Sequence, residues 1–145
     1  MDKAGFLARF VAWIVDGIAV AVLLAVFTAA IGLLGAQASG AGGDPQSVLS
    51  RVAAPIGMML LPMVQFLYFG YVWSHGDQSV GMRLLSLKVI RRNQEPLTFL
   101  RAGLRGTVGY WVSGLILGLG YLWAAVDANR EAWHDKIFDT WVVRA

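Results

Sequence analysis

Three long stretches without a charged side chain constrain this sequence more than any other feature. No Asp, Glu, Lys or Arg occurs in residues 17–43, 52–76 or 106–126. A bilayer core about 30 Å thick needs roughly 20 apolar residues in helical conformation to be crossed, and each stretch is at least that long. Only 14% of the 145 residues are charged, against about 25% in soluble domains. The sequence therefore predicts an integral membrane protein, and it excludes an ordinary soluble enzyme and a nucleic-acid binder.

The apolar stretches predict the membrane segments of a single domain that covers residues 1–145. We expect two full transmembrane helices, at about residues 10–34 and 52–73, and a third membrane segment at about 107–126. Glycines at positions 109, 114, 118 and 120 interrupt the third segment, so it could be broken, re-entrant or fully spanning. The predicted fold class is an all-α integral membrane protein.

The distribution of positive charge predicts how the chain is oriented. Residues 74–106 carry a net charge of +4, whereas residues 35–50 contain one charged residue, Asp44. Short loops rich in Lys and Arg stay on the cytoplasmic side. We therefore expect the N-terminus and residues 74–106 inside the cell and residues 35–50 outside. Tyr68, Tyr71 and Trp73 would then form an aromatic belt at the inner interface.

The predicted cytoplasmic segment, residues 74–106, has a pattern of its own. Residues 85–89 alternate apolar and polar side chains, which predicts a short strand, and residues 140–144 predict another. Between them, Leu97, Leu100 and Leu104 recur at helical spacing beside two arginines, as in an amphipathic interfacial helix. The two strands can meet only if both lie on one side of the membrane. This requirement favours a re-entrant or broken third segment and a cytoplasmic tail at residues 127–145.

Asp16 is an acidic residue within an otherwise apolar span, which makes it the first candidate for chemistry. Arg9 lies seven residues earlier on the same helix face, and Asp16 would sit about 10 Å deeper at 1.5 Å per residue. An ionised Asp near the bilayer centre costs about 2.5–3.5 kcal/mol. Asp16 therefore needs a partner, a water-filled cavity or a proton. It could belong to a proton or cation relay, or it could be a structural clamp that pairs with Arg83 or Arg105.

A second group of titratable side chains follows the third segment. Asp127, His134 and Asp135 lie within nine residues of one another, and histidine titrates near neutrality. They could handle protons at the cytoplasmic mouth of a pathway. Alternatively, they belong to a turn whose acids cap helices or pair with the basic residues of 83–105.

Cofactor and enzyme motifs are lacking in the sequence. There is no cysteine and there are two histidines, which is too few convergent ligands for a metal site. No phosphate loop, nucleophile elbow or metalloprotease motif occurs. We expect no metal, no cofactor and no enzymatic activity.

Stretches at the two ends and the middle of the chain resemble the RDD family of small bacterial membrane proteins, named for one arginine and two aspartates. Residues 6–16 look like the family's opening, so that Arg9 and Asp16 match its arginine and first aspartate. Residues 78–89 are similar to its Gly-Gln-Thr-x-Gly-Lys-Arg stretch and the strand after it. Residues 133–143 resemble its His-Asp ending, which would make Asp135 the second aspartate, with Asp127 as the alternative.

The resemblance covers nearly the whole chain, with departures at three positions. Asp77, Met82 and Asp139 stand where the family usually has glycine, lysine and glycine. The resemblance implies a poorly defined activity, for which transport of unidentified ligands or cation/proton exchange has been suggested.

The expected function is therefore transport of ions or small ligands across the bacterial inner membrane, with Asp16 handling charge and Arg9 setting its protonation. Two or three spans enclose little surface, so transport would require a homo-oligomer or a membrane partner protein in addition to the lipid bilayer. The rival expectation is a non-transporting adaptor or assembly subunit in which the Arg and Asp residues only fix the fold.

Overall fold

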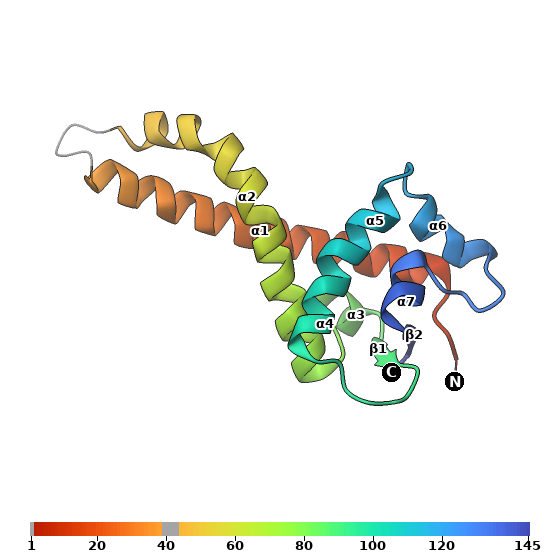
Figure 1. The fold of residues 1–145 in the computed structure, drawn as a ribbon. Coiled ribbons are helices and arrows are strands. Elements are labelled where there is room, and N and C mark those ends of the chain that lie inside the picture. The colour runs from red at the N-terminus through yellow and green to blue at the C-terminus, as the bar shows by residue number, and fades with distance from the viewer. Residues whose placement is uncertain (1, 39–43) are drawn as a thin grey trace.

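Two long helices dominate the computed structural model, which describes residues 2–38 and 44–145. Helix α1 spans Phe6–Ala38 and helix α2 spans Pro45–Gly76. Both are long and apolar enough to cross a membrane, which confirms the two predicted helices. Figure 1 shows their far ends extending beyond the rest of the molecule. Part of the predicted outer loop, residues 39–43, lies outside the described residues.

Helix α2 contains two prolines, Pro55 and Pro62, within its length. Proline removes a backbone donor and clashes with the preceding turn, so it bends a helix. Figure 1 shows that α2 changes direction along its course. The bend lets its second half pack beside the C-terminal part of the chain.

The remaining elements are short and pack around the first half of α1 and the second half of α2 (Figure 1). In chain order they are α3 (Val80–Leu84), β1 (Leu87–Arg91), α4 (Phe99–Leu104), a π-helical turn η1 (Arg105–Gly109), α5 (Tyr110–Gly114), α6 (Leu119–Val126), α7 (Trp133–Phe138) and β2 (Thr140–Arg144).

The third apolar segment is broken, as the glycine pattern predicts. Helical backbone runs from Phe99 to Gly114 and meets α6 at an angle of 91°. The break lies at Leu117 and Gly118, which both have positive φ, 50° and 75°. Glycine adopts this conformation without a steric penalty, so Gly118 suits the turn. The segment begins earlier than the predicted residue 107 because α4 continues directly into η1 and α5.

A two-stranded antiparallel sheet joins the middle of the chain to its C-terminal part. Strand β1 pairs with β2 so that Val89 lies opposite Val142, and Lys3 forms a bridge with Val143. The bounds of β2 agree with the prediction, whereas β1 begins two residues later than predicted. The reason is that Leu85 caps α3 and Ser86 has a positive φ of 52°. The pairing places the chain before and after the bent segment side by side.

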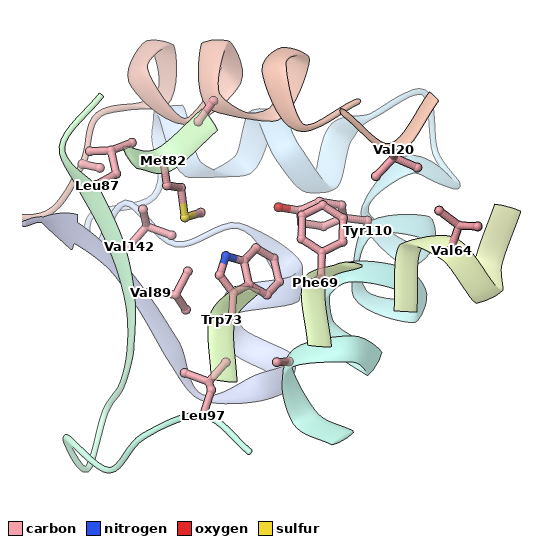
Figure 2. Close-up of a cluster of buried hydrophobic side chains, with 13 residues drawn as sticks. Val20, Val64, Phe69, Trp73, Met82, Leu87, Val89, Leu97, Tyr110 and Val142 are labelled. Carbon is pink, nitrogen blue, oxygen red and sulfur yellow. The ribbon is translucent and has the colours of Figure 1, made fainter. Parts of the chain in front are cut away.

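The buried core lies between the second half of α2, the sheet and α5. Figure 2 shows Trp73 at its centre, between Phe69 and Val89, and its ring contacts Phe69 with centroids 4.5 Å apart. The predicted aromatic belt is therefore wrong for Trp73, which is 0% exposed, and only Tyr71 of the three belt residues is exposed. Trp73 is large enough to fill the space where three elements meet.

Helix α4 packs on α2 through small residues rather than through its leucines. A Cβ on Gly103 would lie 2.6 Å from the Phe66 ring, so only glycine permits this approach. Leu97 is buried, whereas Leu100 is 60% exposed. The apolar side chains of the predicted amphipathic helix are thus divided between the core and the outer surface.

Candidate functional site

The carboxylate of Asp16 is buried at the junction of α1, α2 and α3. Its side chain is held by three neutral donors: Tyr68 Oη and the Gly81 backbone N–H donate to Oδ1 at 2.8 and 2.9 Å, and Ser79 Oγ donates to Oδ2 at 2.5 Å. Asp16 is 1% exposed. The described residues include no arginine or lysine in a salt bridge with it, so neither Arg83 nor Arg105 is its clamp partner. The Asp16 cluster, meaning Asp16, Tyr68, Ser79 and Gly81, joins three helices through hydrogen bonds.

The close approach of α3 to α1 explains how a backbone N–H reaches Asp16. A Cβ at Gly81 would lie 2.1 Å from the carbonyl oxygen of Ala12, a contact that no side chain can make. Ser79 caps α3, and its hydroxyl accepts a hydrogen bond from Met82 N–H at 3.4 Å. Glycine at position 81 therefore permits the helix contact, and Ser79 fixes the start of α3 beside Asp16.

A second buried carboxylate, Asp135, lies between two arginines. Arg9 donates from Nη2 to Oδ2, and Arg105 donates from Nη2 to Oδ1 at 2.5 Å. Arg105 Nε also donates to Thr140 Oγ1 at 2.9 Å, and the Ala132 backbone N–H donates to Asp135 Oδ2 at 3.0 Å. The Asp135 cluster, meaning Arg9, Arg105, Asp135 and Thr140, therefore joins α1, η1, α7 and β2. Arg9 pairs with Asp135 and not with Asp16.

The charges around Asp135 decide its ionisation and that of its neighbour His134. Burial raises the pKa of Asp135, but the positive charges of Arg9 and Arg105 outweigh burial and hold it below its usual range. Burial lowers the pKa of His134 to about 3, and the two arginines oppose its protonation. At pH 7 the Asp135 cluster thus contains two cations and one carboxylate, and the imidazole of His134 beside it is neutral. His134 Nδ1 lies 3.0 Å from Ser113 Oγ.

Asp127 lies outside both clusters and organises a turn. Its Oδ2 accepts hydrogen bonds from the backbone N–H groups of Asn129 and Glu131, each at 3.1 Å, and Lys136 donates to Oδ1 at 2.6 Å. The hydrogen bond from Lys136 lowers the pKa of Asp127. Asp127 therefore belongs to a turn, as one interpretation of residues 127–135 predicts, but its basic partner is Lys136 and not a residue of 83–105.

A cavity of about 590 Å³ lies beside both clusters, between α1 and the α5–α6 pair. Its polar lining includes the ionisable side chains of Arg9, Asp16, Arg105 and His134, together with Gln65 and two tyrosines, Tyr110 and Tyr121. The rest of the lining is mainly aromatic and aliphatic, and several of these side chains are also exposed on the outer surface: Phe10, Trp13, Trp111, Leu117 and Leu122. Pockets of about 300–1,000 Å³ enclose drug-sized molecules, so this cavity is large enough for a ligand.

The structure brings most of the predicted site residues together. The pair of Arg105 and Asp135 matches the expectation that acids of residues 127–135 pair with the basic residues of 83–105, whereas the pair of Arg9 and Asp135 was not expected. Arg9, Asp16 and His134 line one cavity, Asp135 lies directly behind it, and Asp127 lies apart. The sequence interpretation did not identify Tyr68, Ser79 or Gly81 as partners of Asp16. In the part of the chain that the structure describes, no group of three or more His, Asp or Glu side chains could hold a metal ion.

Similarity to known proteins extends over nearly the whole chain. An uncharacterized protein of Bacillus subtilis (strain 168), YxaI, is 28% identical over 151 aligned positions that cover 99% of each chain. No solved structure matches the chain. Residues 3–139, which include both carboxylate clusters except Thr140, match the RDD family. The chain therefore belongs to the RDD family.

Proposed function

We propose that this membrane protein transports an ion or a small ligand and that the cavity beside the two clusters is its binding site. The observation that carries the proposal is the placement of Arg9, Asp16 and Arg105 around a 590 Å³ space within otherwise apolar membrane segments. Ionisable residues inside membrane segments are costly and usually mark substrate or ion pathways.

Asp16 is the acidic residue suited to handle charge in this cavity. Among the described residues that line it, Asp16 is the only acid. Three neutral donors stabilise its carboxylate, but no fixed positive charge cancels it. A cation or a proton that enters the cavity can therefore interact with Asp16 more strongly than with Asp135, whose oxygens face two guanidinium groups.

The proposed orientation places the sheet and both clusters towards the cytoplasm of a bacterial cell. The net charge of +4 on residues 74–106 supports this side for β1, and β2 and Lys3 pair at the same sheet. With α1 and α2 crossing the membrane, the bent segment is re-entrant. A reporter fused after Ala145 should then give a cytoplasmic signal, and an outside signal would contradict this orientation.

Transport is tested with the purified protein in vesicles that contain a pH-sensitive dye. Pulses of NaCl or KCl test cation/proton exchange, and pulses of sodium acetate or sodium stearate test anions. Flux is the rate above that of protein-free vesicles, because the protonated acids cross a bilayer unaided. Gly114 lines the cavity, and a Cβ there meets only Tyr121 at 4.0 Å, whereas a Cβ on Gly57 in α2 meets no atom within 4 Å. Gly114→Leu should therefore block flux by filling the cavity, and Gly57→Leu should leave flux unchanged. Absence of flux for all four salts in the wild type would refute transport.

The hydrogen bonding of both carboxylates supports a second candidate, a non-transporting adaptor or assembly subunit. The carboxylate oxygens of Asp16 and Asp135 all accept hydrogen bonds from this chain, as expected for residues that only fix a fold. This candidate predicts no flux and a stable complex with a membrane partner, which crosslinking in native membranes followed by size analysis would detect. The same crosslinking tests whether a transporter works as a homo-oligomer.

A further inference from the structure

The lining of the cavity changes character between its inner and outer parts. The side chains of Asp16, Arg105 and His134 are at most 5% exposed. The apolar lining residues fall into two sets. Met82, Ala124, Ala132 and Val142 are at most 5% exposed, whereas those of the outer part range from 42% for Trp13 to 95% for Leu117. Since Trp13 and Leu117 belong to apolar membrane segments, their exposed sides face lipid. A molecule that occupied the cavity would therefore meet charged groups at its inner end and hydrocarbon at its outer end.

The charged end includes the carboxylate of Asp16, but on its Arg105 side it has spare capacity for an anion. Arg105 is 0% exposed, and its Nη1 atom makes no hydrogen bond with any described residue, although Nε and Nη2 are both paired. Its guanidinium also lies over the Trp73 ring at 4.5 Å. A buried guanidinium nitrogen without an acceptor is costly. The unused donor favours a ligand that brings a negatively charged oxygen.

From these observations we infer that the cavity binds a single-chain amphipathic carboxylate of the fatty-acid class. The carboxylate accepts hydrogen bonds at the Arg105 end, and the chain leaves between Trp13 and Leu117 into the bilayer. The inference rests on the proposed function in that it uses the same cavity, and it names the ligand class. The volume of about 590 Å³ suits one drug-sized molecule, whereas a two-chain phospholipid is larger.

Brominated stearate provides a direct probe, because bromine quenches tryptophan fluorescence on contact. Trp13 and Trp111 line the cavity, whereas Trp133 is outside the lining. In nanodiscs of phosphatidylcholine, brominated stearate should quench the wild type saturably and bind at least about tenfold tighter than brominated stearyl alcohol, its uncharged analogue. Trp13→Phe should reduce the loss of fluorescence that brominated stearate causes. Trp133→Phe should leave that loss the same as in the wild type.

Matched glycine variants locate the site. Gly114→Leu should weaken stearate binding at least about tenfold, and Gly57→Leu should bind like the wild type. Equal binding of the acid and the alcohol would overturn the anion assignment, and unchanged binding by Gly114→Leu would place the probe on the lipid-facing surface instead. Tighter binding of brominated phosphatidylglycerol than of stearate would overturn the single-chain class in favour of a phospholipid.

The result of the stearate binding experiment can be distinguished from the result of the transport assay. Stearate binding that depends on Gly114, together with absence of flux, would support the ligand class and refute transport. Flux of sodium or potassium ions without stearate binding would support transport and refute the ligand class.

Discussion

The two buried carboxylates of this protein are stabilised by different kinds of partner. Asp135 is neutralised by two guanidinium groups, from Arg9 and Arg105. Asp16 is held by a phenol, a hydroxyl and a backbone N–H. A fixed cation cancels a charge permanently, whereas neutral donors stabilise the charge and leave it in place. The Asp135 carboxylate thus has fixed cations as partners, whereas the carboxyl group of Asp16 has neutral donors and lies at the edge of a cavity.

Removal of the charge of Asp135 should have the largest effect. Asp135→Asn leaves two buried cations without a counter-charge, and breaking such a pair costs about 3–5 kcal/mol. The measurement is the free energy of unfolding in a reversible detergent titration. The control is Asp139→Asn. Asp139 is exposed and has a positive φ of 52°, a conformation that asparagine also adopts, so this variant should change the free energy of unfolding by less than about 0.5 kcal/mol. Similar values for both variants would contradict a stabilising role for the Asp135 cluster.

Asp16→Asn should cost less, because the donors that it leaves are uncharged. Hydrogen bonds to a charged group contribute about 1.5–3 kcal/mol, and the amide retains one oxygen as an acceptor. The same titration, combined with Ser79→Ala and the double variant, measures the coupling between the two side chains. The double variant should lose less stability than the two single variants together. Additive losses would show that the Ser79 hydroxyl does not stabilise Asp16.

Acid should destabilise the protein through His134. The folded pKa is about 3 and the unfolded pKa about 6.5, so the unfolded state binds the proton first as the pH falls. Stability is therefore complete above pH 6.5 and should fall by about 2 kcal/mol between pH 7 and pH 5.

His134→Gln should remove this pH dependence, and His75→Gln, which changes an exposed histidine, should keep it. Below about pH 4, protonation of Asp135, whose folded pKa is depressed, should add a further loss. If the free energy of unfolding of His134→Gln falls between pH 7 and pH 5 as much as that of the wild type, the buried imidazole is not the source of the pH dependence.

The smallest effect is expected for an ion pair outside both clusters. Arg91 and Glu95 form a salt bridge in which the Glu95 side chain is 63% exposed. Exposed pairs contribute about 0.2–1 kcal/mol, so Glu95→Gln should lower the free energy of unfolding by no more than that. A loss comparable to that of Asp16→Asn would remove the distinction between clusters and surface pairs.

The membrane helices and the broken third segment were predictable because their signals are local. Charge-free stretches of spanning length identify α1 and α2, and the glycines around residue 118 mark the turn. The strand at residues 140–144 follows from its own composition. The exact start of β1 did not follow, because Ser86 adopts a backbone conformation that depends on how α3 ends.

Most pairings in the site were not predictable because they depend on chain topology, although the pair of Asp135 and Arg105 follows one of the alternatives stated for residues 127–135. Asp16 was identified from its position in an apolar span, and Arg9 from helical spacing. Helical spacing placed Arg9 on the same face as Asp16, but the fold brings α7 to Arg9, from 126 residues away. Gly81 could have been recognised only from the contact that it permits with Ala12.

The ion pair between Arg9 and Asp135 also constrains the order in which the protein is made. Arg9 enters the membrane early in synthesis, but its counter-charge is translated 126 residues later. Until α7 and β2 leave the ribosome, both guanidinium groups lack their carboxylate and β1 lacks its partner strand. The half-made chain must therefore keep Arg9 and Arg105 in contact with water or lipid headgroups. Exit of α7 and β2 from the ribosome is the event that allows them to be buried.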